Sequence, residues 1–127
     1  MLVWAGEVIK DQLQAGLATS DDKIGRNPAQ VKRMVRGFVK SLILLRKEKT
    51  KVVDLIVKEW KLDPDAADRS YQFIVKTLSP NGSASESAVE NVIQQTLKAT
   101  KTQKEVPHSQ VVNLTFLQEV QKELGLR

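Results

Sequence analysis

The stretch that decides the fold is NPAQVKRMVRGFVKSLILL, from Asn27 to Leu45. Its apolar residues recur at the three-and-four spacing of one helical face. They are Val31, Val35, Phe38, Val39, Leu42 and Leu45. Pro28 suits the first helical turn because a residue there needs no N–H partner, and Asn27 is of a type that caps free backbone amides. The sequence therefore predicts a helix of about five turns that begins at this Asn-Pro pair.

Asp63-Pro64 repeats this signal further along the chain. It predicts that one helix, over residues 51–60, ends near Trp60 and that another, over residues 64–78, begins at the proline. Helical spacing places Trp60 with Val52, Val53 and Ile56, and Tyr71 with Ala67, Ile74, Val75 and Leu78. Since apolar stripes at this spacing are usually core, we interpret both aromatic residues as inward-facing packing residues rather than a ligand-stacking pair.

The rest of the C-terminal half predicts two more helices. SPNG, residues 79–82, has the composition of a type I turn. Ser83 or Ser85 then caps a helix whose buried face carries Val89, Val92, Ile93 and Leu97. KATKTQKEVPHSQ, residues 98–110, is expected to be a connector, and a last helix over residues 114–124 is expected to stop at Gly125.

The N-terminal residues follow a different pattern. LVWA, residues 2–5, and GLATS, residues 16–20, are short and compatible with strands. The fold class predicted is mainly α, with about five helices and one or two short N-terminal strands. We divide the chain into a strand-like segment, residues 1–26, and a helical C-terminal region, residues 27–127.

Composition limits the classes of protein that the chain can represent. It has 127 residues, 41% of them hydrophobic and 28% charged, which is ordinary for a single globular domain. No apolar run approaches the roughly 20 residues that span a bilayer, and the first residues lack the basic leader of a signal peptide. As written, the chain is expected to stay in the cytosol. With no cysteine, disulfides, thiolate chemistry and cysteine-bound metals are excluded.

Catalytic motifs are poorly represented. The sequence has no Gly-rich phosphate loop, no His-Glu zinc helix and no motif that pairs a nucleophile with a catalytic histidine. The acid pairs Asp21/Asp22 and Asp65/Asp68 lie at helix starts or exposed faces, where carboxylates complement the helix dipole. His108, the only histidine, lies in the connector. We therefore expect no enzyme, no catalytic residue, no metal and no cofactor.

A basic cluster around the long helix offers a competing hypothesis. It contains Lys32, Arg33, Arg36, Lys40, Arg46, Lys47, Lys49 and Lys51, and the chain carries a net charge of +5. Such a stripe could neutralise phosphates in a small basic helical domain that binds nucleic acid or regulates another protein. A solvated outer face explains it equally well, and no aromatic residue is interleaved for base stacking. Nucleic-acid binding is therefore the alternative, not the expectation.

The order of these segments resembles the C-terminal part of ABC-transporter substrate-binding proteins of the nitrate, sulfonate, taurine and thiamine-precursor class. The resemblance rests on four segments in their order and spacing. They are GLATS leading into NPAQVKRMVRGFVK, the KEWKLDPDAA joint, the SPNGSASESAVENVI turn and helix, and the terminal FLQEVQKELG. It covers practically the whole chain.

The resemblance implies a fragment of a two-lobed, type II periplasmic-binding α/β fold, which closes on a small solute and delivers it to an ABC permease. In such proteins, residues 1–26 would belong to the second lobe and hinge crossover. Trp4, Gly6 and Glu7 would then be the candidate ligand-binding residues of one cleft wall. The family works in the periplasm or outside the cell. Fungal relatives that make the thiamine pyrimidine use histidine and cysteine residues, so that activity is not expected here.

Self-association follows from the same resemblance. Without the rest of the parent fold, the helices after Asn27 leave apolar faces uncovered, and a homodimer is the commonest way to cover them. We predict that light scattering at micromolar concentration gives twice the single-chain mass of 14.2 kDa. The predicted route is exchange of the N-terminal strand segment around Gly16, so deletion of residues 1–16 should yield monomers. A monomeric full chain would contradict the predicted dimer. A deletion variant that stays dimeric would contradict the strand-exchange route.

Overall fold

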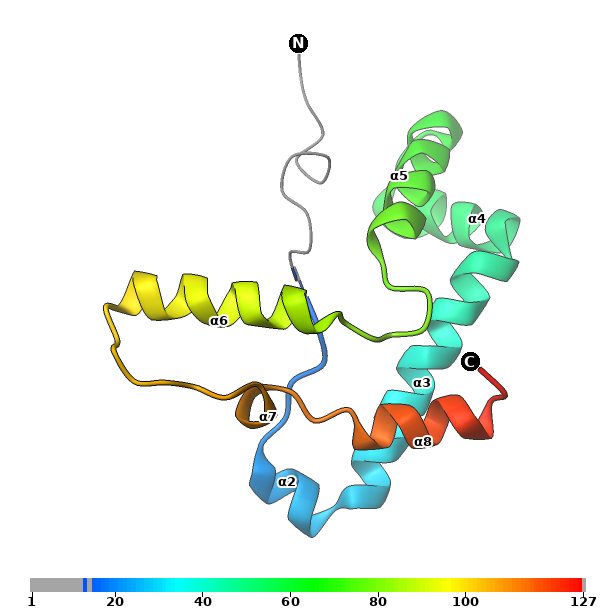
Figure 1. Ribbon diagram of the computed structural model, residues 1–127. Helices are drawn as coiled ribbons and strands as arrows, with labels where there is room; N and C mark the ends of the chain where they lie inside the picture. The colour runs from blue at the N-terminus through cyan, green and yellow to red at the C-terminus, as the bar shows by residue number, and fades with distance from the viewer. Residues whose placement is uncertain (1–12, 14, 127) are drawn as a thin grey trace.

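The computed structural model describes residue 13 and residues 15–126, and within them it contains helices and no strand. Figure 1 shows the helices in chain order. They are α2 (Asp21–Arg26), α3 (Pro28–Lys47), α4 (Lys49–Trp60), α5 (Pro64–Thr77), α6 (Glu86–Thr100), α7 (His108–Val111) and α8 (Thr115–Glu123). The mainly α class predicted from the sequence is confirmed. None of the described helices is both long and apolar enough to cross a membrane.

Side-chain caps explain where several helices begin. The Asp63 carboxylate accepts a hydrogen bond from the Ala66 N–H at 2.9 Å, and the Ser85 hydroxyl accepts one from the Ala88 N–H at 3.1 Å. Of the two serines considered for the start of α6, Ser85 is thus the cap. Asn27 precedes Pro28 as predicted, but its side chain makes no capping bond to α3. Its backbone N–H instead bonds to the Lys23 carbonyl and ends α2.

The N-terminal strands are the main correction within the described residues. Residues 16–20 form no strand and are exposed, whereas residues 21–26 form α2. The reason is local: the Ser20 hydroxyl accepts from the Lys23 N–H at 3.2 Å, and Asp21 and Asp22 lie in the first turn, where acids favour a helix. The other predicted strand, residues 2–5, lies outside the described residues. The segment proposed for exchange, residues 1–16, lies mostly outside the described residues, so the exchange through the Gly16 region stays a prediction.

The first hydrophobic cluster lies between α4 and α5. Its buried members are Val52, Ile56, Ala67 and Tyr71. Tyr71 is only 7% exposed, as its spacing predicted, and its hydroxyl donates to the Leu45 carbonyl of α3 at 3.0 Å. The inward-facing prediction for Trp60 is wrong, since this residue is 57% exposed. Trp60 ends α4, and the chain turns away at Lys61, which adopts a left-handed conformation.

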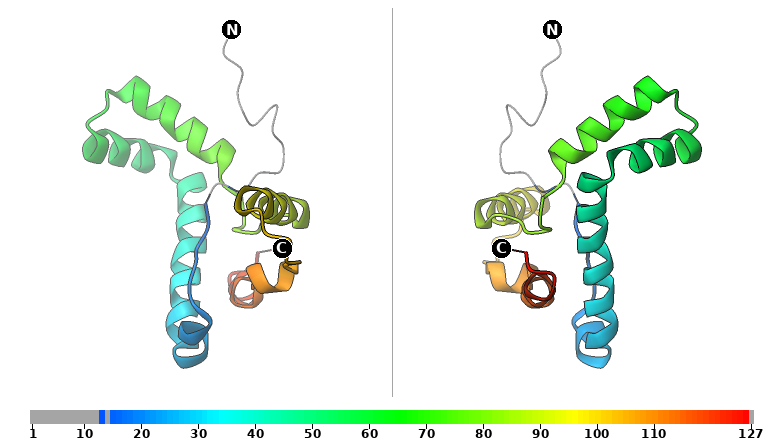
Figure 2. Two further views of the ribbon diagram at one scale, coloured as in Figure 1. Left: turned by 90° about the vertical axis from the view of Figure 1, so that its left-hand side faces the viewer. Right: turned by 90° about the vertical axis from the view of Figure 1, so that its right-hand side faces the viewer.

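The second cluster lies between α3 and α8, and its buried members are Val39, Leu117 and Val120. Val35, Ile43, Leu114 and Leu124 surround them. The two clusters share no buried residue, and α3 borders both. In Figure 2 the α4–α5 hairpin projects from one side of α3, while α6 and α8 lie on the other. Most of the buried apolar residues among those described thus form two small clusters, which α3 joins.

The SPNG turn connects these two parts. The Asn81 side-chain oxygen accepts from the Ser83 N–H at 3.0 Å, and the Asn81 carbonyl accepts from the Gln121 side chain of α8 at 2.9 Å. Gly82 has a φ of +82°, a conformation that L side chains rarely adopt, and a Cβ there would lie 3.4 Å from the Leu117 side chain. The turn therefore favours glycine for its backbone conformation, and it packs directly against Leu117 of α8.

The connector predicted for residues 98–110 is shorter than expected, because α6 continues to Thr100 and α7 begins at His108. Lys101, in a left-handed conformation, ends α6. Ala88, Val89 and Ile93 form the buried face of α6, and α6 contacts α7. Gly125 follows α8 with a φ of +67°, as the predicted helix stop requires.

We predict that Val39→Ala lowers the free energy of unfolding by about 2 kcal/mol, because it removes buried methyl groups and leaves a cavity. Val39 is fully buried between α3 and α8, whereas its neighbour Phe38, the centre of the predicted stripe, is only partly buried. Urea denaturation measures the loss. The matched control is Val111→Ala, at a position 51% exposed, which should cost less than about 0.5 kcal/mol. Equal losses would contradict the assignment of this core.

Candidate functional site

The candidate ligand-binding residues Trp4, Gly6 and Glu7 lie outside the described residues. Their role in binding therefore stays a prediction. The described residues offer a different polar site, at the contact between α3 and α8.

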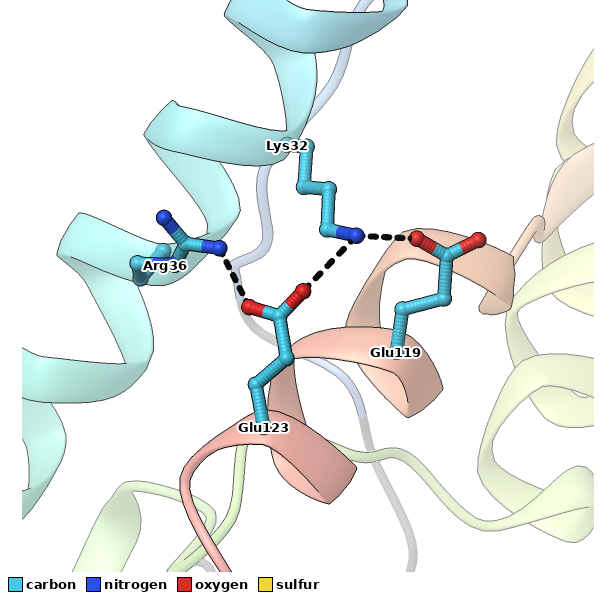
Figure 3. A network of polar contacts seen from close by, with 4 residues as sticks. All are labelled: Lys32, Arg36, Glu119 and Glu123. Atoms are coloured by element: carbon cyan, nitrogen blue, oxygen red, sulfur yellow. Dashed lines mark hydrogen bonds and ion pairs between the residues drawn. The ribbon is translucent and has the colours of Figure 1, made fainter.

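This site consists of two cations on α3 and two carboxylates on α8, which point toward one another in Figure 3. The Lys32 ammonium lies 2.5 Å from the Glu119 carboxylate and 2.8 Å from the Glu123 carboxylate. Arg36 pairs with the second oxygen of Glu123. Each helix contributes residues four positions apart, which lie on one face one turn from each other. Glu123 is therefore held between two cations.

The pairing shifts the pKa values of both signs of charge. Hydrogen bonds from Lys32 and then Arg36 lower the pKa of Glu123 below its ordinary value. Hydrogen bonds to Glu119 and then Glu123 raise the pKa of Lys32. These side chains are between 28% and 46% exposed, so solvent screens their attraction. The ion pairs therefore add little to the free energy of unfolding, and their main effect is to set how α3 and α8 align.

Other members of the basic cluster also have partners inside the molecule. Lys49 pairs with Asp68 at 2.6 Å and lies over the Tyr71 ring. Its hydrogen bond, followed by that of Gln72, lowers the pKa of Asp68. Lys51 pairs with Glu48 at 2.9 Å. The acid pair Asp65/Asp68 therefore has two roles. Asp65 lies in the first turn of α5, whereas Asp68 forms an ion pair with Lys49 and so connects α5 to α4.

Arg46 binds backbone instead of a carboxylate. Its guanidinium donates to the Leu78 carbonyl at 2.5 Å and to the Val75 carbonyl at 3.4 Å. These carbonyls belong to the end of α5, where helical carbonyls lack intrahelical partners and carry partial negative charge. Arg46 therefore fastens the end of the α4–α5 hairpin to α3.

Three members of the cluster remain on the outer face of α3: Arg33, Lys40 and Lys47 are exposed. None of them makes an ion pair with the described residues. The continuous basic stripe that the sequence indicates is thus reduced to these three cations. A protein that neutralises so few phosphates gains little affinity for nucleic acid.

The sequence reasoning missed Glu119 and Glu123. Their spacing is the feature that indicates a pairing. Glu119 and Glu123 are four positions apart on one predicted helix, as are Lys32 and Arg36 on another. The sequence does not say which helices are neighbours, so the pairing could not be chosen.

An open hollow of about 630 Å³ lies between the start of α6 and α7. Glu86, Glu90 and His108 line it, together with Ser87, Pro107 and Ser109. Among the described residues, no group of three or more histidine or acidic side chains is placed to hold a metal ion. The hollow therefore combines acids with one histidine but lacks the converging ligands of a metal centre.

We predict that Glu123→Gln lowers the melting temperature at pH 7 and that this difference disappears in acid. A carboxylate whose folded pKa is depressed stabilises the fold above its unfolded pKa, near 4.5, and the stabilisation is lost as the pH falls through the lower folded value. Thermal unfolding followed by circular dichroism between pH 7 and pH 3 measures it. Glu59→Gln is the control, since the ion pair of Glu59 with Lys58 is long, at 3.9 Å, and both side chains are more than half exposed. A difference that stays constant with pH would rule out the ion pairs as its cause.

Comparison of the chain with models of known protein families, with curated proteins and with solved structures finds no match.

Proposed function

We propose that the chain is the C-terminal part of a solute-binding component of an ABC importer, which takes up a small nutrient such as a sulfonate, nitrate or a thiamine precursor. The observation that carries the proposal is the order of segments from GLATS to the terminal FLQEVQKELG, which resembles that class along the chain. In this role the chain does no chemistry. It supplies a helical packing unit and at most one wall of a cleft.

The packing of the helices supports a role as part of a larger assembly. Most of the buried apolar residues belong to two small clusters, and Trp60 and Leu55 remain more than half exposed on α4. Large apolar side chains that stay exposed in this way lose contact with water when another protein body covers them. In the proposed role, the remainder of a two-lobed binding protein, or a second copy of the chain, covers them.

Uptake measurements test the importer role. Deletion of the coding sequence should abolish uptake of one labelled solute among nitrate, taurine, an alkanesulfonate and the thiamine pyrimidine. Re-expression of the wild-type chain should restore uptake, and re-expression of Val39→Asp, which places a charge in the α3–α8 core, should not. Unchanged uptake of all four solutes in the deletion strain would refute the proposal.

We further predict that the chain alone binds none of these solutes with sub-micromolar affinity. Solute pockets in two-lobed binders enclose the ligand from both sides, and a single wall leaves one side in water. Isothermal titration calorimetry with each solute measures this. Sub-micromolar binding would show that a complete site lies within these residues, and it would leave the importer role intact while correcting the one-wall description.

A further inference from the structure

The outer face of α3 carries a second helical pattern, distinct from the buried stripe. Arg33, Lys40 and Lys47 are spaced by seven residues, so their Cα atoms lie in one line along the helix, about 10.5 Å apart. Beside this line runs a seam at alternating spacings of three and four. Its members are Met34, Gly37, Ser41 and Leu44. In heptad terms the seam occupies the a and d positions and the cations occupy successive g positions.

Both rows are available to a partner. Met34 is 61% exposed and Leu44 is 54% exposed, and the three cations are exposed without an ion pair to the described residues. The interior of the molecule uses other positions of α3, since Val39 and Leu42 are buried on the opposite side. A Cβ added at Gly37 would meet nothing within 4 Å, so the centre of the seam has space for a side chain from outside. The seam is therefore small at its centre and apolar at its two ends.

Charge decides which occupant fits. In a helix pair that packs through a and d, the g residues face charged residues on the neighbouring helix, and opposite charges select the partner. A second copy of α3 in antiparallel pairing would place the three cations against three cations, which disfavours it. A partner helix with acidic residues every seven positions would match the same 10.5 Å interval, about one per cation.

We propose that the outer face of α3 is a docking site for an acidic amphipathic helix of another protein. The partner helix lies along α3, with large apolar residues over Gly37 and Ser41 and with carboxylates opposite Arg33, Lys40 and Lys47. The apolar seam favours this occupant over nucleic acid, whose phosphates would leave Met34 and Leu44 without apolar contact. The proposal does not depend on the importer role.

A designed peptide tests the docking site. The probe is a fluorescently labelled helix of about 21 residues, three heptads, with leucine at a and d and glutamate at e and g. A second peptide has lysine in place of every glutamate. The acidic peptide should bind the chain in fluorescence anisotropy at about 50 mM salt, more weakly at about 500 mM, and the lysine peptide should not bind. No binding of the acidic peptide at millimolar concentration would overturn the proposal.

Charge reversal locates the site. Arg33→Glu combined with Lys40→Glu and Lys47→Glu should weaken binding of the acidic peptide by about tenfold or more. The matched control reverses Lys98, Lys104 and Lys122, which are exposed elsewhere, and changes the net charge equally. Circular dichroism verifies that both triple variants fold. Equal weakening by the control would reduce the effect to net charge and overturn the site.

Two more probes distinguish other anionic partners. A duplex of about 20 base pairs and vesicles containing phosphatidylserine are titrated against the wild type and both triple variants. We expect neither to bind in a way that depends specifically on Arg33, Lys40 and Lys47. If the duplex or the vesicles require these three cations and bind more tightly than the acidic peptide, α3 serves a nucleic acid or a membrane surface, and the proposal is wrong.

Discussion

The contact between α8 and α3 is the constraint on which the rest of the arrangement depends. Residues distant in the sequence meet there, with Val39 packed against Leu117 and Val120 and with Glu123 held by Lys32 and Arg36. The apolar contact supplies most of the free energy that holds α8 on α3, because the ion pairs are partly exposed and screened by solvent. The ion pairs fix the register, since a shift of α8 by one residue would rotate Glu119 and Glu123 away from the cations. The turn at Asn81 and Gly82 packs on this contact and so directs α6.

Much of the fold could be predicted from residues that act locally. Asp63-Pro64 and Ser85 begin α5 and α6 because their side chains bond to backbone amides within three residues. The buried faces of α3, α4 and α5 follow from apolar spacing, as Val39, Ile56 and Tyr71 illustrate. The strand prediction for residues 16–20 failed because short β-compatible runs become strands only beside another strand, and the Ser20 cap favoured a helix next to them.

Long-range features could not be predicted in the same way. Trp60 has the spacing of a buried residue, but its exposure depends on where the α4–α5 hairpin ends relative to the other helices. The basic residues of α3 look alike in the sequence, yet Lys32, Arg36 and Arg46 have internal partners while Arg33, Lys40 and Lys47 have none among the described residues. Which of them is left for another molecule depends on the neighbour of each helix face. The candidate ligand residues Trp4, Gly6 and Glu7 lie outside what the structure describes.

The placing of most buried apolar residues in two clusters affects how the molecule responds to a local disturbance. The clusters share no buried residue, so packing changes around Ile56 and Ala67 are not passed to Val39 and Val120 through a common member. Their energetic effects should then be nearly additive, as for sites without common partners. A structural change in one half can reach the other through helix α3 itself. It can also pass through two hydrogen bonds at the end of α3, from Arg46 to the Leu78 carbonyl and from the Tyr71 hydroxyl to the Leu45 carbonyl. A partner that binds along the whole of α3 would therefore couple the motions of the two clusters, because α3 borders both.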